Sequence, residues 1–145
     1  MAFHGTFEHS LDAKNRLTVP SKFRAALSGT VFLVRGAEPC ISVYPEAVYS
    51  ALAEQSLSGL NPLSAQAKQL SRFFYGKADD LELDGAGRVT LHSKHLEHAR
   101  IDGRDTVITG AGDCLEIWDR AAWERYDAEL TEQAPDLTAS LGHPA

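Results

Sequence analysis

Two Asp-x-x-x-Arg motifs are the residues of this chain best suited to chemistry. Asp12 and Arg16 lie four positions apart, and Asp84 and Arg88 repeat that spacing 72 residues later. A carboxylate can cap a turn and accept a hydrogen bond from a guanidinium, which fixes the arginine. An arginine held in this way suits a phosphate or the O6/N7 edge of guanine. A folding salt bridge, repeated because the segment was duplicated, explains the pattern equally well.

The first motif carries additional cations that favour the nucleic-acid interpretation. Its residues 12–16 include Lys14, and Lys22 and Arg24 follow on the next element. These side chains predict a compact basic surface that can reach into a groove of nucleic acid. In the second motif Ala86 stands where the first has Lys14, and acidic residues offset the cations. We therefore expect the first motif to be the stronger DNA reader and the second to be more of a scaffold.

Other kinds of site find less support. His92, His95 and His98 are spaced three apart, so on a helix they would drift round the surface rather than converge on a metal. Cys40 and Cys114 suit a disulfide or a nucleophile, but a small buried residue at the start of a strand explains them more simply. The sequence contains no P-loop, Rossmann glycine pattern or nucleophile elbow. We expect no metal, no cofactor and no enzymatic activity.

The two motifs belong to a longer internal repeat. Residues 11–22 return as residues 83–94 at an offset of 72, and residues 40–44 return as residues 114–118 at an offset of 74. Each copy spans about 45 residues, too few to form a good core alone. The sequence therefore predicts one domain built from two half-domains that complete one another.

The sequence pattern of each half-domain predicts the same secondary-structure elements in the same order. Alternating apolar residues indicate two strands joined by a turn that bears the motif, then a short helix, then two more strands. Further apolar stripes predict helices over residues 46–52, 65–75 and 120–130, the last capped by Asp119. We expect half-domains over residues 5–54 and 77–130, a helical connector over residues 55–76 and a disordered tail over residues 131–145.

The charge of the chain is polarised. The formal net charge is −6, yet residues 1–35 carry five lysines and arginines against two acidic residues. Residues 105–145 carry two arginines against nine acidic residues. One end can therefore face a polyanion while the other faces solvent or a neighbouring subunit. The sequence has no run of apolar residues long enough for a membrane span and no secretion signal at its start, which predicts a cytoplasmic protein without membrane contact.

These motifs together resemble the MraZ family of bacterial transcriptional regulators, within the AbrB/SpoVT superfamily. The similarity covers about residues 3–130. It rests on Phe3-His4-Gly5, the segment 11–20, Phe73-Phe74, Leu83-Asp84, Gly87-Arg88, the segment 110–113 and Glu116-Ile117-Trp118. Two positions depart from the family pattern. Asn15 replaces a glycine but can adopt the same positive φ. His92 replaces a proline, which is expected to loosen the start of the second short helix.

The resemblance implies a fold, a function and an assembly. The fold is mainly β with short helices, in which two swapped-hairpin half-domains interlock into a small β-barrel. The function is sequence-specific binding of double-stranded DNA at short direct repeats upstream of the cell-division and cell-wall gene cluster. The assembly is a ring-shaped homo-oligomer, an octamer or larger, at the nucleoid. The candidate DNA-binding residues are Asp12, Lys14, Asn15, Arg16, Lys22, Arg24, Asp84, Arg88 and Lys94.

Two alternatives stay open at this point. The chain could be an AbrB-type antitoxin or a protein-interaction module that also touches DNA, in which case a partner would bind through the acidic C-terminal helix. An enzyme that uses the carboxylates is the other alternative.

Overall fold

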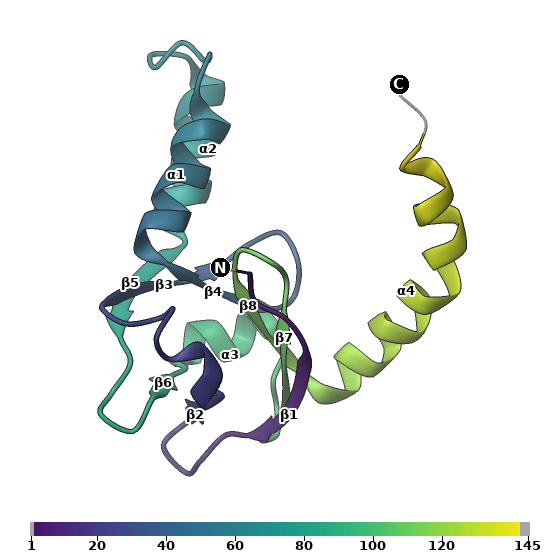
Figure 1. Cartoon of the computed structure of the whole chain (residues 1–145). Helices are drawn as coiled ribbons and strands as arrows, with labels where there is room; N and C mark the ends of the chain where they lie inside the picture. Colours follow the sequence, from purple (N-terminus) through teal and green to yellow (C-terminus); the bar gives the residue numbers. More distant parts are fainter. Residues whose placement is uncertain (1, 143–145) are drawn as a thin grey trace.

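The computed structural model describes residues 2–142, which form a mainly β domain with helices appended at both halves (Figure 1). The first half contains β1 (Thr6–Ser10), β2 (Arg16–Thr18), a 3₁₀ turn η1 (Ser21–Phe23), β3 (Thr30–Arg35), β4 (Ile41–Pro45) and α1 (Glu46–Leu57). Helix α2 (Ala65–Gly76) connects the halves. The second half contains β5 (Ala78–Glu82), β6 (Arg88–Thr90), α3 (Ser93–Ala99), β7 (Asp105–Gly110), β8 (Leu115–Asp119) and α4 (Arg120–Ser140).

The halves are interlocked by an exchange of strands. Strand β1 of the first half pairs antiparallel with β7 of the second, and β5 of the second half pairs antiparallel with β3 of the first. The short strands β2 and β6 pair with each other. The predicted mainly β fold with swapped hairpins is therefore confirmed. It also explains why neither copy needs a complete core of its own.

The strand ladders do not close into a barrel within residues 2–142. Six strands form one sheet in the order β1-β7-β8-β4-β3-β5, and β2 and β6 form a separate two-stranded sheet. Strands β1 and β5 remain edges of the larger sheet because β2 and β6 are only three residues long and pair only with one another. The small sheet instead covers the larger one through its buried side chains.

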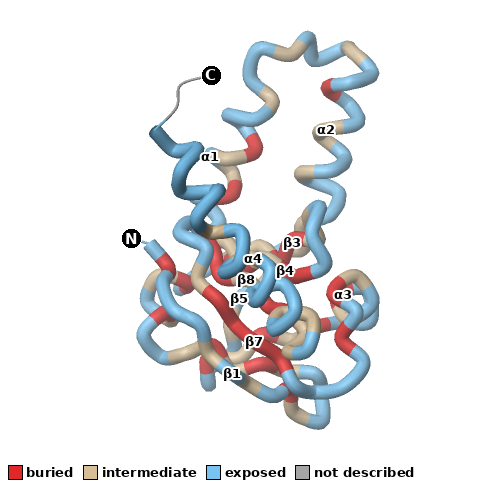
Figure 2. Tube along the Cα trace, turned by 90° about the vertical axis from the view of Figure 1, so that its right-hand side faces the viewer, coloured by how far each residue is buried: buried red, intermediate tan, exposed pale blue. Residues whose placement is uncertain are grey.

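The core lies between the two sheets and under the short helices (Figure 2). Leu17 of β2 and Val89 of β6 are almost completely buried there, while their neighbours along each strand are half-exposed. This alternation places one face of the small sheet on the core and the other toward solvent. Leu33, Ile41 and Ile117 supply the facing side of the core from the larger sheet.

Helices α1 and α2 extend from the β domain on the side away from the hairpin turns, whereas α4 starts beside β1 and runs outward from the domain (Figure 1). Helices α1 and α2 form an antiparallel pair, in which the Tyr49 hydroxyl donates to the Phe74 carbonyl at 2.6 Å. Helix α4 follows β8 and has no buried residue. Asp119 caps it as predicted, accepting from the Ala122 N–H at 3.1 Å. No helix within residues 2–142 has the length and apolar character that a membrane crossing requires.

The segment after Leu130 differs from the disordered tail expected from the sequence. Helix α4 continues to Ser140, and only residues 143–145 of the expected tail lie outside the described residues. Pro135 lies inside the helix without ending it, although its ring removes one backbone hydrogen bond. The Thr138 hydroxyl donates to the Ala134 carbonyl at 2.8 Å in this last part.

Candidate nucleic-acid interface

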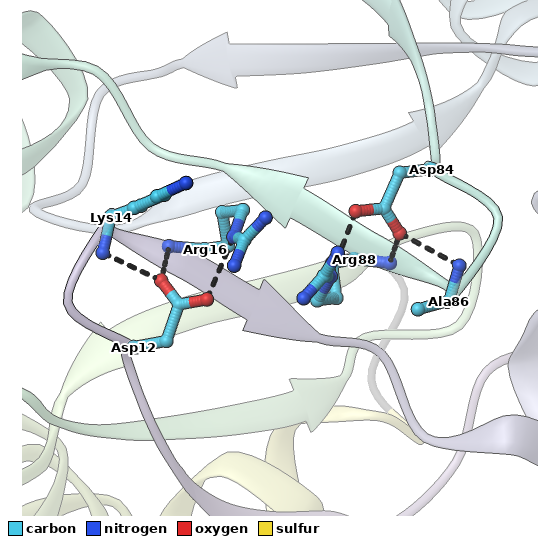
Figure 3. A network of polar contacts seen from close by, with 6 residues as sticks. All are labelled: Asp12, Lys14, Arg16, Asp84, Ala86 and Arg88. Carbon is cyan, nitrogen blue, oxygen red and sulfur yellow. Dashed lines mark hydrogen bonds and ion pairs between the residues drawn. The ribbon is translucent and has the colours of Figure 1, made fainter.

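One carboxylate organises the turn of the first hairpin, residues 12–16, called the first tip below. Asp12 Oδ1 accepts hydrogen bonds from the backbone N–H groups of Lys14 and Arg16, both at 2.9 Å (Figure 3). Asp12 Oδ2 accepts from Arg16 Nε at 2.7 Å. Asn15 has a φ of 58°, which confirms that it adopts the conformation expected of the family's glycine.

The turn of the second hairpin, residues 84–88, has the same construction and is called the second tip. Asp84 Oδ1 accepts from the N–H groups of Ala86 at 3.0 Å and Arg88 at 2.9 Å, and Oδ2 accepts from Arg88 Nε at 2.8 Å. Gly87 has a φ of 75°. The two tips are thus local copies of one another, and each aspartate holds its own arginine (Figure 3).

These contacts keep both aspartates ionised and both arginines oriented. The hydrogen bond from the Arg16 backbone is the largest influence that lowers the pKa of Asp12, to about 2. The corresponding bond from Arg88 likewise lowers the pKa of Asp84. Each guanidinium uses only Nε for its aspartate. No protein hydrogen bond from residues 2–142 reaches the Nη atoms of either arginine, so those donors are available to a ligand.

The two arginines lie on the same face of the small sheet. In the β2–β6 register Arg16 pairs with Thr90 and Thr18 pairs with Arg88, while Leu17 pairs with Val89. Because side chains alternate along a strand, the first four share the outer face and the last two face the core. Thr18 and Thr90 were not among the sequence-predicted site residues. The alternation of Arg-Leu-Thr and Arg-Val-Thr is the signal that identifies them.

The other cations of the first half occupy three different places. Lys14 is exposed at the first tip, as expected. Lys22 lies over two aromatic rings, with Nζ 4.6 Å from the Phe7 centroid and 4.9 Å from the Phe23 centroid. Arg24 lies against the second tip rather than the first. The structure therefore does not gather these residues into the single basic surface that their order in the sequence suggests.

Lys94 and two histidines form a polar cluster at the start of α3. Lys94 Nζ lies 2.7 Å from one oxygen of Asp79, and His95 Nε2 lies 3.0 Å from the other. The His92 backbone N–H donates to His95 Nδ1 at 3.0 Å. This bond orders the first turn of α3. The sequence predicted that His92, in place of the family's proline, would loosen the start of this helix. The structure differs, because the His95 ring accepts a hydrogen bond from the His92 backbone N–H.

The cysteines are structural within this fold. Cys40 and Cys114 are free and buried. Burial raises the pKa of both thiols, that of Cys114 to about 12, so neither is a thiolate near neutral pH. The interpretation as small buried residues is confirmed. Residues 2–142 bring no three His, Cys, Asp or Glu side chains together in a way that could hold a metal ion.

Comparison with known proteins adds independent information. A family model described as "MraZ protein, putative antitoxin-like" matches residues 2–72 and 74–140. A protein of Nocardia farcinica named Transcriptional regulator MraZ is 40% identical over 143 residues, which is 97% of each chain. Proteins of the same name from Lactiplantibacillus plantarum and Desulforamulus reducens are 37% and 36% identical over 139 residues, 96% of this chain.

Proposed function

Since the chain belongs to the MraZ family, whose relatives above are named transcriptional regulators, we propose that it binds DNA sequence-specifically and regulates transcription. Its sites are short direct repeats in the promoter of the cell-division and cell-wall gene cluster. It binds them in the cytoplasm, at the nucleoid, as a ring-shaped homo-oligomer. The resemblance to the family supports the operator and the assembly, and the geometry of the two tips supports the DNA contact.

The observation that carries the proposal is the state of the two arginines. Arg16 and Arg88 project from the outer face of one small sheet, each fixed through Nε, with their Nη donors not engaged by residues 2–142. A guanidinium presented in this way can bind a phosphate or a guanine edge without a further cost in ordering. A purely structural salt bridge does not require an outward-facing position for both arginines.

Lys14 gives the first tip the larger share of the binding. The first tip has Lys14 and Arg16 against Asp12, whereas the second has Ala86 where the first has lysine. A ring brings several such tips to the DNA. Acidic helix α4 starts beside β1 and runs away from the tips, so most of its negative charge lies at a distance from the proposed contact (Figure 1).

The proposal predicts unequal effects of two matched substitutions. Arg16→Ala abolishes binding to the protein's own upstream region in gel-shift titrations, because the first tip loses its held guanidinium. Arg88→Ala lowers the affinity less. The oligomeric state is measured on each variant by sedimentation and is expected to remain unchanged, because both side chains are on the outer face of the small sheet.

A footprint of the wild-type protein on its upstream region tests the same proposal directly. Protection of short, regularly spaced repeats is the expected result. Normal binding by Arg16→Ala would remove the first tip from the DNA-binding site. A wild-type protein that leaves this region unprotected at low salt would contradict the proposed function as a whole.

A further inference from the structure

We propose that Arg24 of the first half completes the second tip, so that the second DNA-contact site is built from both halves of the chain. The ligand of this site is a DNA phosphate. The inference rests on the proposed function and deepens it. It assigns to the second tip a cation that the sequence order places with the first.

The contact between Arg24 and Gly87 carries the inference. A side chain at position 87 would start on top of the Arg24 guanidinium, since an added Cβ would lie 2.6 Å from Arg24 Cζ and 2.8 Å from Cδ. Gly87 is buried although it belongs to an exposed turn. The three atoms nearest to such a Cβ all belong to the Arg24 side chain. The absence of a side chain at Gly87 therefore makes room for the arginine.

Two hydrogen bonds attach this contact to the frame of the fold. The Val19 N–H donates to the Gly87 carbonyl at 2.9 Å, which joins the end of the first hairpin to the second tip. Arg24 Nε donates to the Val19 carbonyl at 3.3 Å. The stem of Arg24 is thus held across the second tip. As with Arg16 and Arg88, the Nη atoms of Arg24 have no protein hydrogen bond within residues 2–142.

The arginine also faces the same solvent-open hollow as the tip. A hollow of about 300 Å³ is lined by Arg24 together with Asp84, Gly85 and Gly87, and by Glu82 at the end of β5. From its own half the second tip has one cation, Arg88, against two carboxylates. Arg24 lines the hollow and Arg88 does not, so the Arg24 guanidinium offsets the charge of Asp84 and Glu82 there and offers a phosphate a cation where an acidic surface alone would repel it.

The second half has no arginine at the position that corresponds to Arg24. The position 72 residues after Arg24 is Leu96, which packs against the hydrophobic core. The first tip instead has Lys14 and tolerates a side chain at Asn15, the counterpart of Gly87. Each tip therefore has two cations. The first tip has Arg16 and its own Lys14, and the second has Arg88 and Arg24 from the other half. The second tip is a DNA contact and not only a scaffold, although Glu82 leaves it less positive than the first.

The salt dependence of DNA binding measures this contact. The plot of log Kobs against log salt has a negative slope. Loss of one phosphate contact makes this slope shallower by about 0.9 for each protomer engaged. Arg24→Ala is expected to produce that decrease on the protein's own upstream DNA, and Arg24→Lys to retain most of the slope. Lys68→Ala is the matched control, because Lys68 is an exposed cation on α2, away from the tips, and its loss is expected to leave the slope unchanged.

A double-mutant cycle tests whether Arg24 acts at the second tip. An asparagine at position 87 can keep the positive φ but displaces the guanidinium. Gly87→Asn is therefore expected to reproduce the loss of Arg24→Ala, and the two together to lose no more than either alone. The cycle of Arg24→Ala with Lys14→Ala, at the other tip, is expected to be additive. Should Arg24→Ala fail to fold, Arg24→Gln, which keeps the stem over Gly87, replaces it.

The outcomes separate the two proposals. An unchanged slope for Arg24→Ala and Arg24→Gln, or full additivity with Gly87→Asn, overturns the assignment of Arg24 while leaving the proposed function intact. A wild-type protein that does not bind its upstream DNA overturns the proposed function, and the assignment of Arg24 with it.

Discussion

Residues 72 positions apart occupy equivalent places in the two halves, but some of them differ in chemical type. In the first half Phe7 packs edge-on against Phe23, with centroids 5.8 Å apart, and Lys22 lies over both rings. The same three places in the second half hold Asp79, His95 and Lys94. The lysine that lies over an aromatic pair in the first half is thus matched in the second half by a lysine beside a partly exposed aspartate and a buried histidine. The lysine is kept in both halves, but it contacts aromatic rings in the first and a carboxylate in the second.

The His95 ring has a defined protonation state in this cluster. It is completely buried, and its Nδ1 accepts from the His92 N–H, so the proton of the neutral ring is on Nε2 and is donated to Asp79. Burial lowers the pKa of His95, more than the neighbouring carboxylate raises it. Burial works to raise the pKa of Asp79, but the hydrogen bonds from Lys94 and His95 outweigh it and lower that pKa.

We therefore predict that the protein loses stability as the pH falls below about 6.5, where an unfolded histidine takes up a proton. The folded state resists that proton because the pKa of His95 is lowered, so the unfolded state binds more protons and gains relative to the folded state. Above about pH 6.5 both states hold this histidine neutral, and His95 makes its full contribution to the free energy of unfolding. Denaturant unfolding at about pH 7.5 and about pH 5.5 measures the loss.

A control for this prediction comes from the other half of the chain. The double substitution Asp79→Phe with His95→Phe copies the pair Phe7 and Phe23 and removes the titrating ring. The free energy of unfolding of this double variant is expected to change less between the same two pH values than that of the wild type. Equal slopes for the wild type and the double variant would show that His95 is not the source of the acid sensitivity.

At the scale of elements, contacts close in sequence were predictable and contacts between halves were not. Both tips follow from Asp12 and Asp84, whose short side chains cap their own turns, and α4 begins at the predicted cap Asp119. The family resemblance supplied the exchange of β1 and β5. The place of Arg24 depends on a partner 63 positions away that is a glycine, and glycine carries no chemical signal of its own.

The junction of β8 and α4 depends on one aromatic side chain. Trp118 is 3% exposed and stacks on Tyr126, with centroids 5.0 Å apart, while Trp123 packs against its edge. Its Nε1 donates to Glu116 at 3.2 Å. Helix α4 has no buried residue and packs on β7 and β8, and these ring contacts hold its first turns against β8.

Trp118→Ala is therefore predicted to lower the free energy of unfolding by about 3–5 kcal/mol, the range for truncating a buried aromatic side chain. Thermal or denaturant unfolding measures it. Leu137→Ala, at a position on the same helix that is 49% exposed, is the control and should change stability by less than about 0.5 kcal/mol. An unchanged melting curve for Trp118→Ala would exclude Trp118 from the core.

At the scale of the whole molecule, the fold separates the charges that the sequence distributes along the chain. The tips lie at one end of the β domain, α1 and α2 extend from the opposite side, and the acidic α4 starts beside β1 and runs away from the tips (Figure 1). A chain with a formal net charge of −6 thereby presents the tip cations Lys14, Arg16 and Arg88 apart from most of the acidic α4. Each protomer has only a few cations there, so the proposed function leads us to expect weak DNA binding by one protomer at one site and strong binding only by several protomers together.

This requirement predicts how affinity depends on the number of DNA repeats. Linked sites can raise apparent affinity by about 10²–10⁴ without any new type of contact, provided that the oligomer spans them. We expect DNA carrying several copies of the repeat, at native spacing, to bind more tightly than DNA carrying one by a factor in that range. Titrations of both DNAs at the same salt concentration measure it. Changing the spacing by half a helical turn turns neighbouring repeats to opposite faces of the DNA and should remove most of the gain. Equal affinity for all three DNAs would mean that a single protomer's tips suffice, and that the ring has no part in recognition.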